Sequence, residues 1–215
     1  MKYLFFDLDG TLVDSSAGIY SSIAYALGKM AREPLELAAL RRFIGPPLLD
    51  SFLALGMTEK EAEASVAWYR EHYKQGAMLQ VQVYEGIEAL LKNLASKEGY
   101  QLQIATSKPE IFAKEILAEL GLDRYFNGIY GADLEGVRHN KAAVLAYAME
   151  KTPGALAENS WMIGDREHDI LGAFTNGLPA VGVLWGFGSK KELEDAGASY
   201  CAANTAELQA YCERL

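Results

Sequence analysis

Cysteine and histidine are scarce in this chain. Its 215 residues include two cysteines, Cys201 and Cys212, and three histidines. The cysteines do not have the spacing of a zinc site or of a redox motif, and the histidines do not cluster with them. We therefore expect no zinc site, and two thiols rather than a disulfide, as is usual in the reducing cytosol.

Long apolar runs and an excess of positive charge are also lacking. Asp7 interrupts the apolar N-terminal stretch after four residues, which argues against a signal peptide, and no stretch approaches the length of a membrane span. The chain has 20 basic and 29 acidic residues, a net charge of −9. We expect a soluble cytoplasmic protein whose partners include neither nucleic acid nor membrane. The oligomeric state stays open.

The order of the periodic segments predicts an α/β fold. Residues 2–6 read as a short buried strand, and residues 16–78 are helical in period with Pro and Gly breaks. Strands and helices then alternate, which indicates a doubly wound, Rossmann-like parallel sheet with right-handed crossovers. The predicted later strands are 102–106, 128–132, 161–164, 180–184 and 199–202, and the predicted helices are 87–97, 110–120, 141–150, 170–176, 192–196 and one from 205.

Two domains follow from this pattern. Residues 1–15 and 83–215 would form the sheet-containing core, and residues 16–82 an inserted all-helical domain. The alternating stretch 79–84 fits either an edge strand or a returning hinge, and we favour the hinge.

The segment "FFDLDGTLVDS" places Asp7 and Asp9 at the end of the first strand. Two anions about 4 Å apart repel by roughly 4 kcal/mol at an effective dielectric near 20, so folding alone gives little reason to pair them. A turn built on Asp-Gly is the alternative interpretation of this segment.

Polar side chains also follow two other predicted strands. Thr106, Ser107 and Lys108 follow "LQIA", while Asp165 and Asp169 follow "SWMIG". In a parallel sheet these groups share one edge, where ligands of such sheets bind. Lys141, which begins a predicted helix, is expected to reach that edge.

Carboxylates without histidine or cysteine favour Mg²⁺, which takes oxygen ligands and substrate phosphate. At such a site Asp7 can act as a nucleophile that forms an aspartyl-phosphate, and Asp9 as the general acid and base. Thr106 and Ser107 can donate to the phosphoryl oxygens, and Lys141 can neutralise their charge. The expected substrate is a small phosphorylated metabolite.

These residues resemble the motifs of the haloacid dehalogenase-like hydrolases. The four matching segments are "DLDGTLVDS", Thr106 in "IATSKP", Lys141 in "HNKAAVL", and "GDREHD". The resemblance implies Mg²⁺ held by the Asp7 carboxylate, the Asp9 main-chain carbonyl and Asp165, with Asp169 binding either directly or through water. It also implies that the insert is a mobile cap of the first (C1) type. "TSKP", "YEGIEALL" and "VLWGFGSKKEL" further resemble the phosphoglycolate-phosphatase-like branch.

Several alternatives remain at this stage. Asp165 could simply cap a helix, and Lys141 and Lys108 could face water. Arg41 and Arg42 are candidate substrate contacts, although arginines on an exposed helix are the more common case. Their helical spacing predicts that Trp68, Tyr69 and Tyr73 lie in the core of the insert.

The activity also has rivals. A sugar phosphomutase shares the same motifs, and a non-catalytic phosphate sensor would use the same ligands.

Overall fold

The structure is a computed structural model that describes residues 1–134 and 137–215. The chain packs into two compact units, residues 1–13 with 83–215, and residues 14–82. Over the described ranges, no helix is both long enough and apolar enough to cross a bilayer. Cys201 and Cys212 are free thiols, as expected.

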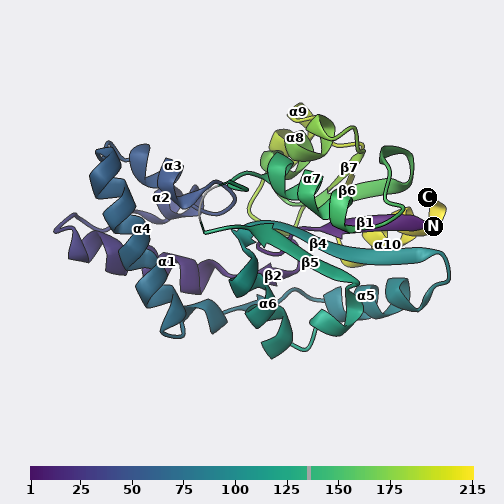
Figure 1. Ribbon diagram of the computed structural model, residues 1–215, viewed down its shortest axis with the longest axis horizontal. Helices are drawn as coiled ribbons and strands as arrows, with labels where there is room; N and C mark the ends of the chain where they lie inside the picture. The colour runs from purple at the N-terminus through teal and green to yellow at the C-terminus, as the bar shows by residue number, and fades with distance from the viewer. Residues whose placement is uncertain (135–136) are drawn as a thin grey trace. The chain divides into compact units, whose positions relative to one another are not determined.

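The first unit is built on a parallel sheet of six strands in the order β5-β4-β1-β6-β7-β8 (Figure 1). This confirms the predicted α/β fold. The strands are β1 (Lys2–Phe6), β4 (Tyr100–Pro109), β5 (Gly128–Ala132), β6 (Ser160–Gly164), β7 (Ala180–Val183) and β8 (Tyr200–Ala202). The strand order reverses direction beside β1, so the carboxyl end of β1 lies at the switch point where ligands of such sheets bind.

Helices cover both faces of this sheet (Figure 1). The helices of the first unit are α5 (Ile87–Ser96), α6 (Glu110–Glu119), α7 (Lys141–Lys151), α8 (Glu167–Thr175), α9 (Lys190–Asp195) and α10 (Thr205–Arg214), with short 3-10 turns η2 (Asp123–Tyr125) and η3 (Ala157–Asn159). Side chains of β1 alternate between the two layers. Tyr3 and Phe5 pack with Val144 and Leu145 of α7. Leu4 and Phe6 point to the other face and are fully buried as well, which is why the sequence of β1 reads as one buried run.

The second unit is helical. It contains α1 (Ser16–Lys29), α2 (Leu37–Arg41), α3 (Leu48–Leu53), α4 (Glu59–Lys74) and the 3-10 turn η1 (Ala77–Leu79). Thr58 and Glu61 form a capping box that begins α4. Tyr69 and Tyr73 are buried and stacked, as predicted, whereas Trp68 is only partly buried beneath Lys29.

Two short strands lie where the chain passes from one unit to the other. β2 (Val13–Asp14) pairs with β3 (Gln82–Val83) in a separate two-stranded sheet. The stretch 79–84, whose sequence fits either an edge strand or a hinge, therefore contains a short strand that lies outside the six-stranded sheet. The hinge stays a prediction.

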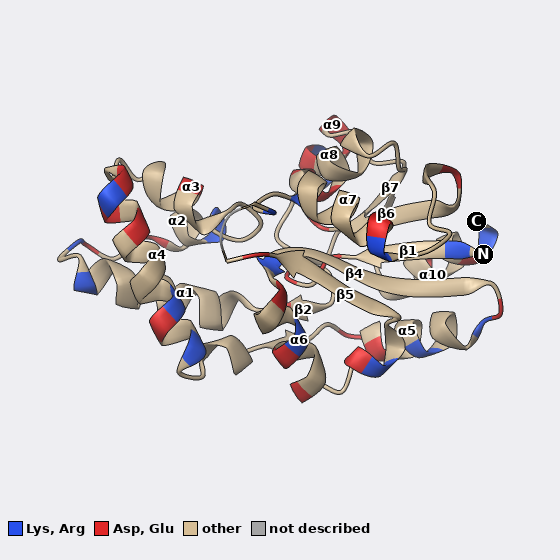
Figure 2. Cartoon of the chain, in the orientation of Figure 1, with Lys and Arg blue, Asp and Glu red and all other residues tan. Residues whose placement is uncertain are grey.

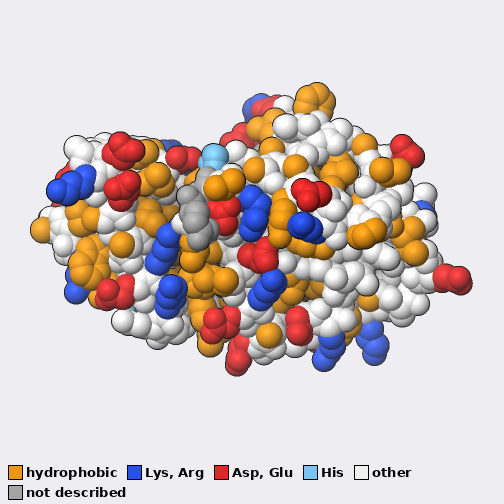
Figure 3. Space-filling model, viewed as in Figure 1, with side chains coloured by type: hydrophobic (Ala, Val, Ile, Leu, Met, Phe, Trp, Pro, Cys, Tyr) orange, Lys and Arg blue, Asp and Glu red, His pale blue; other side chains and the backbone are white. Residues whose placement is uncertain are grey.

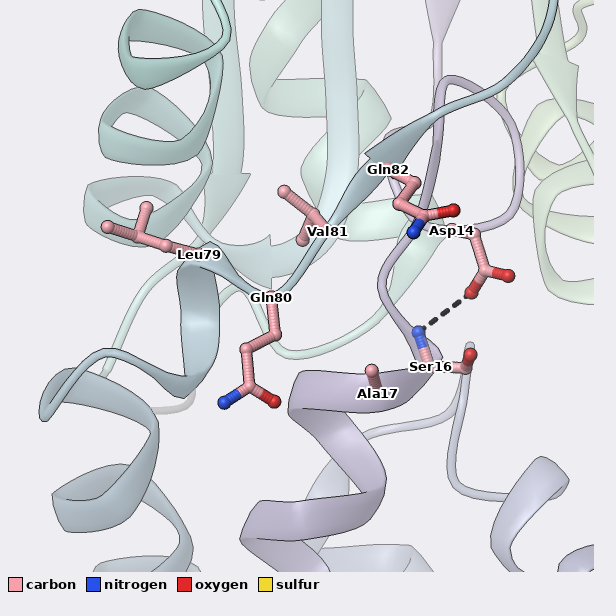
Figure 4. Close-up of a pocket in the computed structure, with 7 residues that line it drawn as sticks. All are labelled: Asp14, Ser16, Ala17, Leu79, Gln80, Val81 and Gln82. Carbon is pink, nitrogen blue, oxygen red and sulfur yellow. Dashed lines mark hydrogen bonds between the residues drawn. The ribbon is translucent and has the colours of Figure 1, made fainter.

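The second unit also holds a pocket of about 280 Å³ beside the first turn of α1 (Figure 4). Its lining residues come from the two ends of the unit: Asp14, Ser16, Ala17, Leu79, Gln80, Val81 and Gln82. Asp14 Oδ1 accepts a hydrogen bond from the Ser16 N–H at 2.9 Å. The Asp14 carboxylate thus satisfies a free N–H group at the start of α1.

Charged side chains of both signs are spread over the molecule. Acidic and basic positions both occur along α4 and α5 (Figure 2). On the face drawn in Figure 3, they lie interspersed with hydrophobic side chains. Among the described residues of that face, the excess acidic charge is therefore not gathered into one patch.

Candidate active site

Asp7 lies directly after β1, at the carboxyl edge of the sheet. Its N–H donates to the Ile163 carbonyl of β6 at 2.9 Å, and the residue is 6% exposed. The chain then turns at Gly10, which has a φ of +83°. A Cβ on Gly10 would also overlap with the Asp165 carboxylate. Glycine is therefore required at this turn both for its conformation and for the approach of Asp165.

Asp165 and Asp169 arrive at the same place from the β6–α8 connection. Carboxylate oxygens of Asp7, Asp165 and Asp169 all lie within 4.8 Å of one another, and all three residues are buried. Asp169 Oδ2 accepts the Arg166 N–H at 3.1 Å, so Asp169 caps α8. The alternative that Asp165 is the helix cap is wrong, because its carboxylate accepts the Phe187 N–H at 2.7 Å instead.

Lys141 at the start of α7 joins these carboxylates. Its ammonium lies 2.7 Å from Asp7 Oδ1 and 2.7 Å from Asp169 Oδ1, and donates to the Ala105 carbonyl at 3.0 Å. Burial opposes the charged form, but the charges of Asp169 and Asp7 outweigh it and raise the pKa of Lys141 to about 12. Lys141 is therefore a buried cation that stays protonated at neutral pH, and not a solvated helix lysine.

The three buried carboxylates carry more charge than Lys141 can balance. Burial raises the pKa of Asp165 well above its usual range, and the charges of Asp169 and Asp7 add to the shift. Burial also raises the pKa of Asp169 to about 6, against the lowering effect of Lys141. An all-oxygen donor set with surplus negative charge fits a hard divalent cation. This group could therefore hold a metal ion.

Asp9 forms a second charged pair beside the first group. Its Oδ2 lies 2.9 Å from the ammonium of Lys108, which is 8% exposed. The alternative in which Lys108 faces water is therefore wrong. The N–H of Lys108 donates to the hydroxyl of Thr106 at 3.2 Å, within an irregular stretch of β4 between Thr106 and Pro109. Thr106 is buried and Ser107 partly buried.

Arg41 and Arg42 belong to the second unit. Arg41 ends α2, Arg42 follows it, and both are exposed. Their proposed contact with substrate stays a prediction.

Sequence reasoning missed three groups around Asp165. The Thr11 hydroxyl donates to Asp165 Oδ1 at 3.4 Å, the Phe187 N–H donates to Oδ2, and the Trp185 indole donates to the Thr11 carbonyl at 3.0 Å. The Gly-Phe-Gly run after β7 was the one available signal, since glycines often permit close backbone approach.

Comparison with known proteins assigns the family. A sequence profile of the haloacid dehalogenase-like hydrolases matches residues 4–183. A 5′-nucleotidase of Pseudomonas aeruginosa is 40% identical over 211 residues, which are 98% of this chain and 95% of the relative. The tyrosine-protein kinase PtkA of Mycobacterium tuberculosis is 39% identical over 187 residues, 87% of this chain and 63% of that longer protein.

A solved structure agrees with this assignment. The crystal structure of a predicted phosphatase from Clostridium acetobutylicum has 42% identity and a TM-score of 0.95, covering 100% of this chain and 99% of that one. Phosphoglycolate phosphatase 1 of Pseudomonas aeruginosa is more distant, with 29% identity over 96% of this chain and 78% of the relative. The resemblance inferred from the motifs is confirmed. The chain belongs to the haloacid dehalogenase-like hydrolase family and is a phosphatase of that family.

Proposed function

We propose that this protein is a Mg²⁺-dependent phosphatase that hydrolyses a small phosphomonoester through an aspartyl-phosphate on Asp7. The observation that carries the proposal is the buried group of Asp7, Asp165 and Asp169, whose oxygens lie within 4.8 Å of one another. Their charge is incompletely balanced by Lys141. Such an arrangement costs folding energy and is explained by a ligand that brings positive charge.

The protein groups divide the chemistry between them. A carboxylate oxygen of Asp7 attacks phosphorus as the ester P–O bond breaks, and Asp9 gives its proton to the leaving oxygen. Asp9 then takes a proton from water, whose oxygen attacks phosphorus and releases Asp7 and inorganic phosphate. Thr106, Ser107 and Lys141 would bind the phosphoryl oxygens. Mg²⁺, held by the Asp7 and Asp165 carboxylates, the Asp9 carbonyl and Asp169 (directly or through water), would supply positive charge that screens phosphate from the carboxylates.

We also propose that the two units act as catalytic core and cap. Residues 1–15 and 83–215 would be the core, residues 16–82 the helical cap, and hinges would lie near residues 13–16 and 82–86. Closure would exclude water from the attack of Asp7 and would bring Arg41 and Arg42 to the leaving group.

The names of the relatives favour small phosphate esters as substrates. Nucleoside monophosphates and phosphoglycolate are the first candidates, because relatives are named 5′-nucleotidase and phosphoglycolate phosphatase. Transfer of a phosphoryl group to a protein tyrosine is a further candidate activity, because another relative is named a tyrosine-protein kinase.

The test is a panel of phosphorylated metabolites, assayed with Mg²⁺, with EDTA, and with Mg²⁺ restored. We expect inorganic phosphate from at least one ester, lost with EDTA and regained with Mg²⁺. An isomeric sugar phosphate without phosphate release would establish the phosphomutase instead. Binding without turnover would establish the sensor, and phosphotyrosine formed from ATP would establish a kinase.

A further inference from the structure

The segment after β7 makes direct contact with Asp165. We call residues 185–188, with the sequence Trp-Gly-Phe-Gly, the 185–188 loop. The Phe187 N–H donates to Asp165 Oδ2 at 2.7 Å, and the Thr11 hydroxyl lies 3.4 Å from Oδ1. Loops from two different strands therefore hold the two oxygens of one fully buried carboxylate.

Two glycines of the loop leave room for Asp165. A Cβ on Gly186 would overlap with the Gly10 carbonyl oxygen and with the Asp165 side chain. A Cβ on Gly188 would overlap with the Asp165 carbonyl oxygen. Neither glycine has a φ in the left-handed region, so space, and not backbone conformation, requires glycine here.

Trp185 and Glu192 connect the 185–188 loop and α9 to other residues near Asp165. The Trp185 indole N–H donates to the Thr11 carbonyl at 3.0 Å, which links the loop to the turn that follows Asp7. On α9, Glu192 Oε1 lies 2.7 Å from Arg166 Nε and accepts the Glu167 N–H at 3.0 Å. These contacts hold the turn that follows Asp7 and the two residues that directly follow Asp165.

We propose that the 185–188 loop sets the position of the Asp165 carboxylate for metal binding, with Trp185 and Gly186 as positioning residues. The inference rests on the proposed function, in which Asp165 is a metal ligand. A buried carboxylate can bind a metal only if its oxygens point at the ion. Partners that orient a ligand typically change metal affinity by roughly 10- to 100-fold when they are removed.

The test measures the binding of Mn²⁺, a paramagnetic substitute for Mg²⁺, by following free Mn²⁺ with electron paramagnetic resonance. The variants are Gly186→Ala and Trp185→Phe. The first adds a methyl group that overlaps with the Asp165 side chain, and the second removes the indole N–H but keeps an aromatic ring. The matched controls are Gly28→Ala, at an exposed glycine with open space around it, and Trp161→Phe, on β6 outside the loop.

We expect the dissociation constant for Mn²⁺ to rise roughly 10- to 100-fold in both loop variants and to stay unchanged in both controls. Turnover of p-nitrophenyl phosphate should recover in Trp185→Phe as Mg²⁺ is raised, with KM for the ester unchanged. A merely structural role would lower turnover by the same factor at every Mg²⁺ concentration.

Two results would overturn the inference. Wild-type Mn²⁺ affinity in folded Trp185→Phe and Gly186→Ala would refute it and leave the proposed function intact. If Gly186→Ala does not fold, Trp185→Phe decides alone. A wild-type protein that binds no Mn²⁺ would refute the proposed function, and the inference with it.

Discussion

The two units bury different kinds of side chain. The first buries Asp7, Asp165, Asp169, Lys108 and Lys141 at one edge of its sheet. The second, residues 14–82, buries apolar and aromatic side chains, and its buried polar residues are four serines. Serine hydroxyls are inexpensive to bury, whereas charges are costly unless they are paired. The charge clustered in the first unit is therefore the part of the molecule that stability alone does not explain.

The largest expected effect comes from Asp7→Asn. The amide has nearly the shape of the carboxylate but is a poor nucleophile, so we expect a folded protein that loses turnover on the order of 10⁵- to 10⁶-fold. Phosphate release and circular dichroism measure the two properties. Asp123→Asn, at an exposed acid on η2, is the control and should keep full activity. Retained activity in Asp7→Asn would rule out a mechanism through an aspartyl-phosphate on Asp7.

Lys141→Met should be the most destabilising change at the site. It leaves Asp7 and Asp169 buried without their cation, which costs roughly 3–5 kcal/mol of unfolding free energy in the metal-free protein. The loss should shrink as the pH falls and Asp169 takes up a proton, starting above pH 6 in the variant because Lys141 lowers the pKa of Asp169 in the wild type. Urea unfolding with and without Mg²⁺ is the measurement.

Lys191→Met is the matched control for that experiment. Lys191 pairs with Asp195 at 2.6 Å but is 83% exposed, so removing it should change stability little. Equal stability of Lys141→Met and the wild type at pH 8 would contradict the charge balance inferred here.

Two glycines of α1 test how closely the second unit is packed. A Cβ on Gly18 would overlap with the Ala77 carbonyl oxygen, whereas Gly28 has open space around it. We expect Gly18→Ala to lower the unfolding free energy by roughly 1–3 kcal/mol. Gly28→Ala should raise it by about 0.5–1 kcal/mol, because alanine favours a helix interior. Thermal unfolding of both variants checks the pair, and equal effects would contradict the close packing of α1 on η1.

Metal affinity should depend on pH with a definite sign. Asp169, with a pKa of about 6, and Asp165, with a pKa raised by burial, must lose protons before a cation binds. Lys141, with a pKa of about 12, stays charged throughout. Affinity should therefore rise with pH, by about tenfold between pH 5 and pH 7 from Asp169 alone, with release of protons. Calorimetry in buffers of different ionisation enthalpy measures both the metal affinity and the number of protons released. An affinity that does not change with pH, without proton release, would contradict this prediction.

The sequence predicted the fold well because local and long-range signals agreed. Apolar runs and Gly or Pro breaks located β1, β5 and α7 within a residue of their observed bounds. The predicted helix 170–176 begins three residues later than α8, whose first turn is stabilised by Asp169 accepting the Arg166 N–H. β4 runs on to Pro109 because pairing with β5 resumes after an irregularity that local sequence does not reveal.

The site was predictable where topology alone brings residues together. Asp7 and Asp165 follow β1 and β6, and Thr106 lies near the end of the neighbouring β4, so their meeting at one edge required only the strand order. The contacts of Lys108 with Asp9 and of the 185–188 loop with Asp165 depend on side-chain reach and loop shape. Those features are fixed by packing and are not encoded in a local pattern.

The most direct test is to trap the phosphorylated aspartate in Asp9→Asn with p-nitrophenyl phosphate. Its leaving group needs little protonation, so the ester still phosphorylates the protein, whereas water is no longer activated and dephosphorylation slows. Acid quenching, borohydride reduction and peptide mass analysis then locate the label. We predict label on Asp7, with none when Mg²⁺ is omitted. Phosphate release during which Asp7 stays unlabelled, or label on another residue, would contradict nucleophilic attack by the first aspartate.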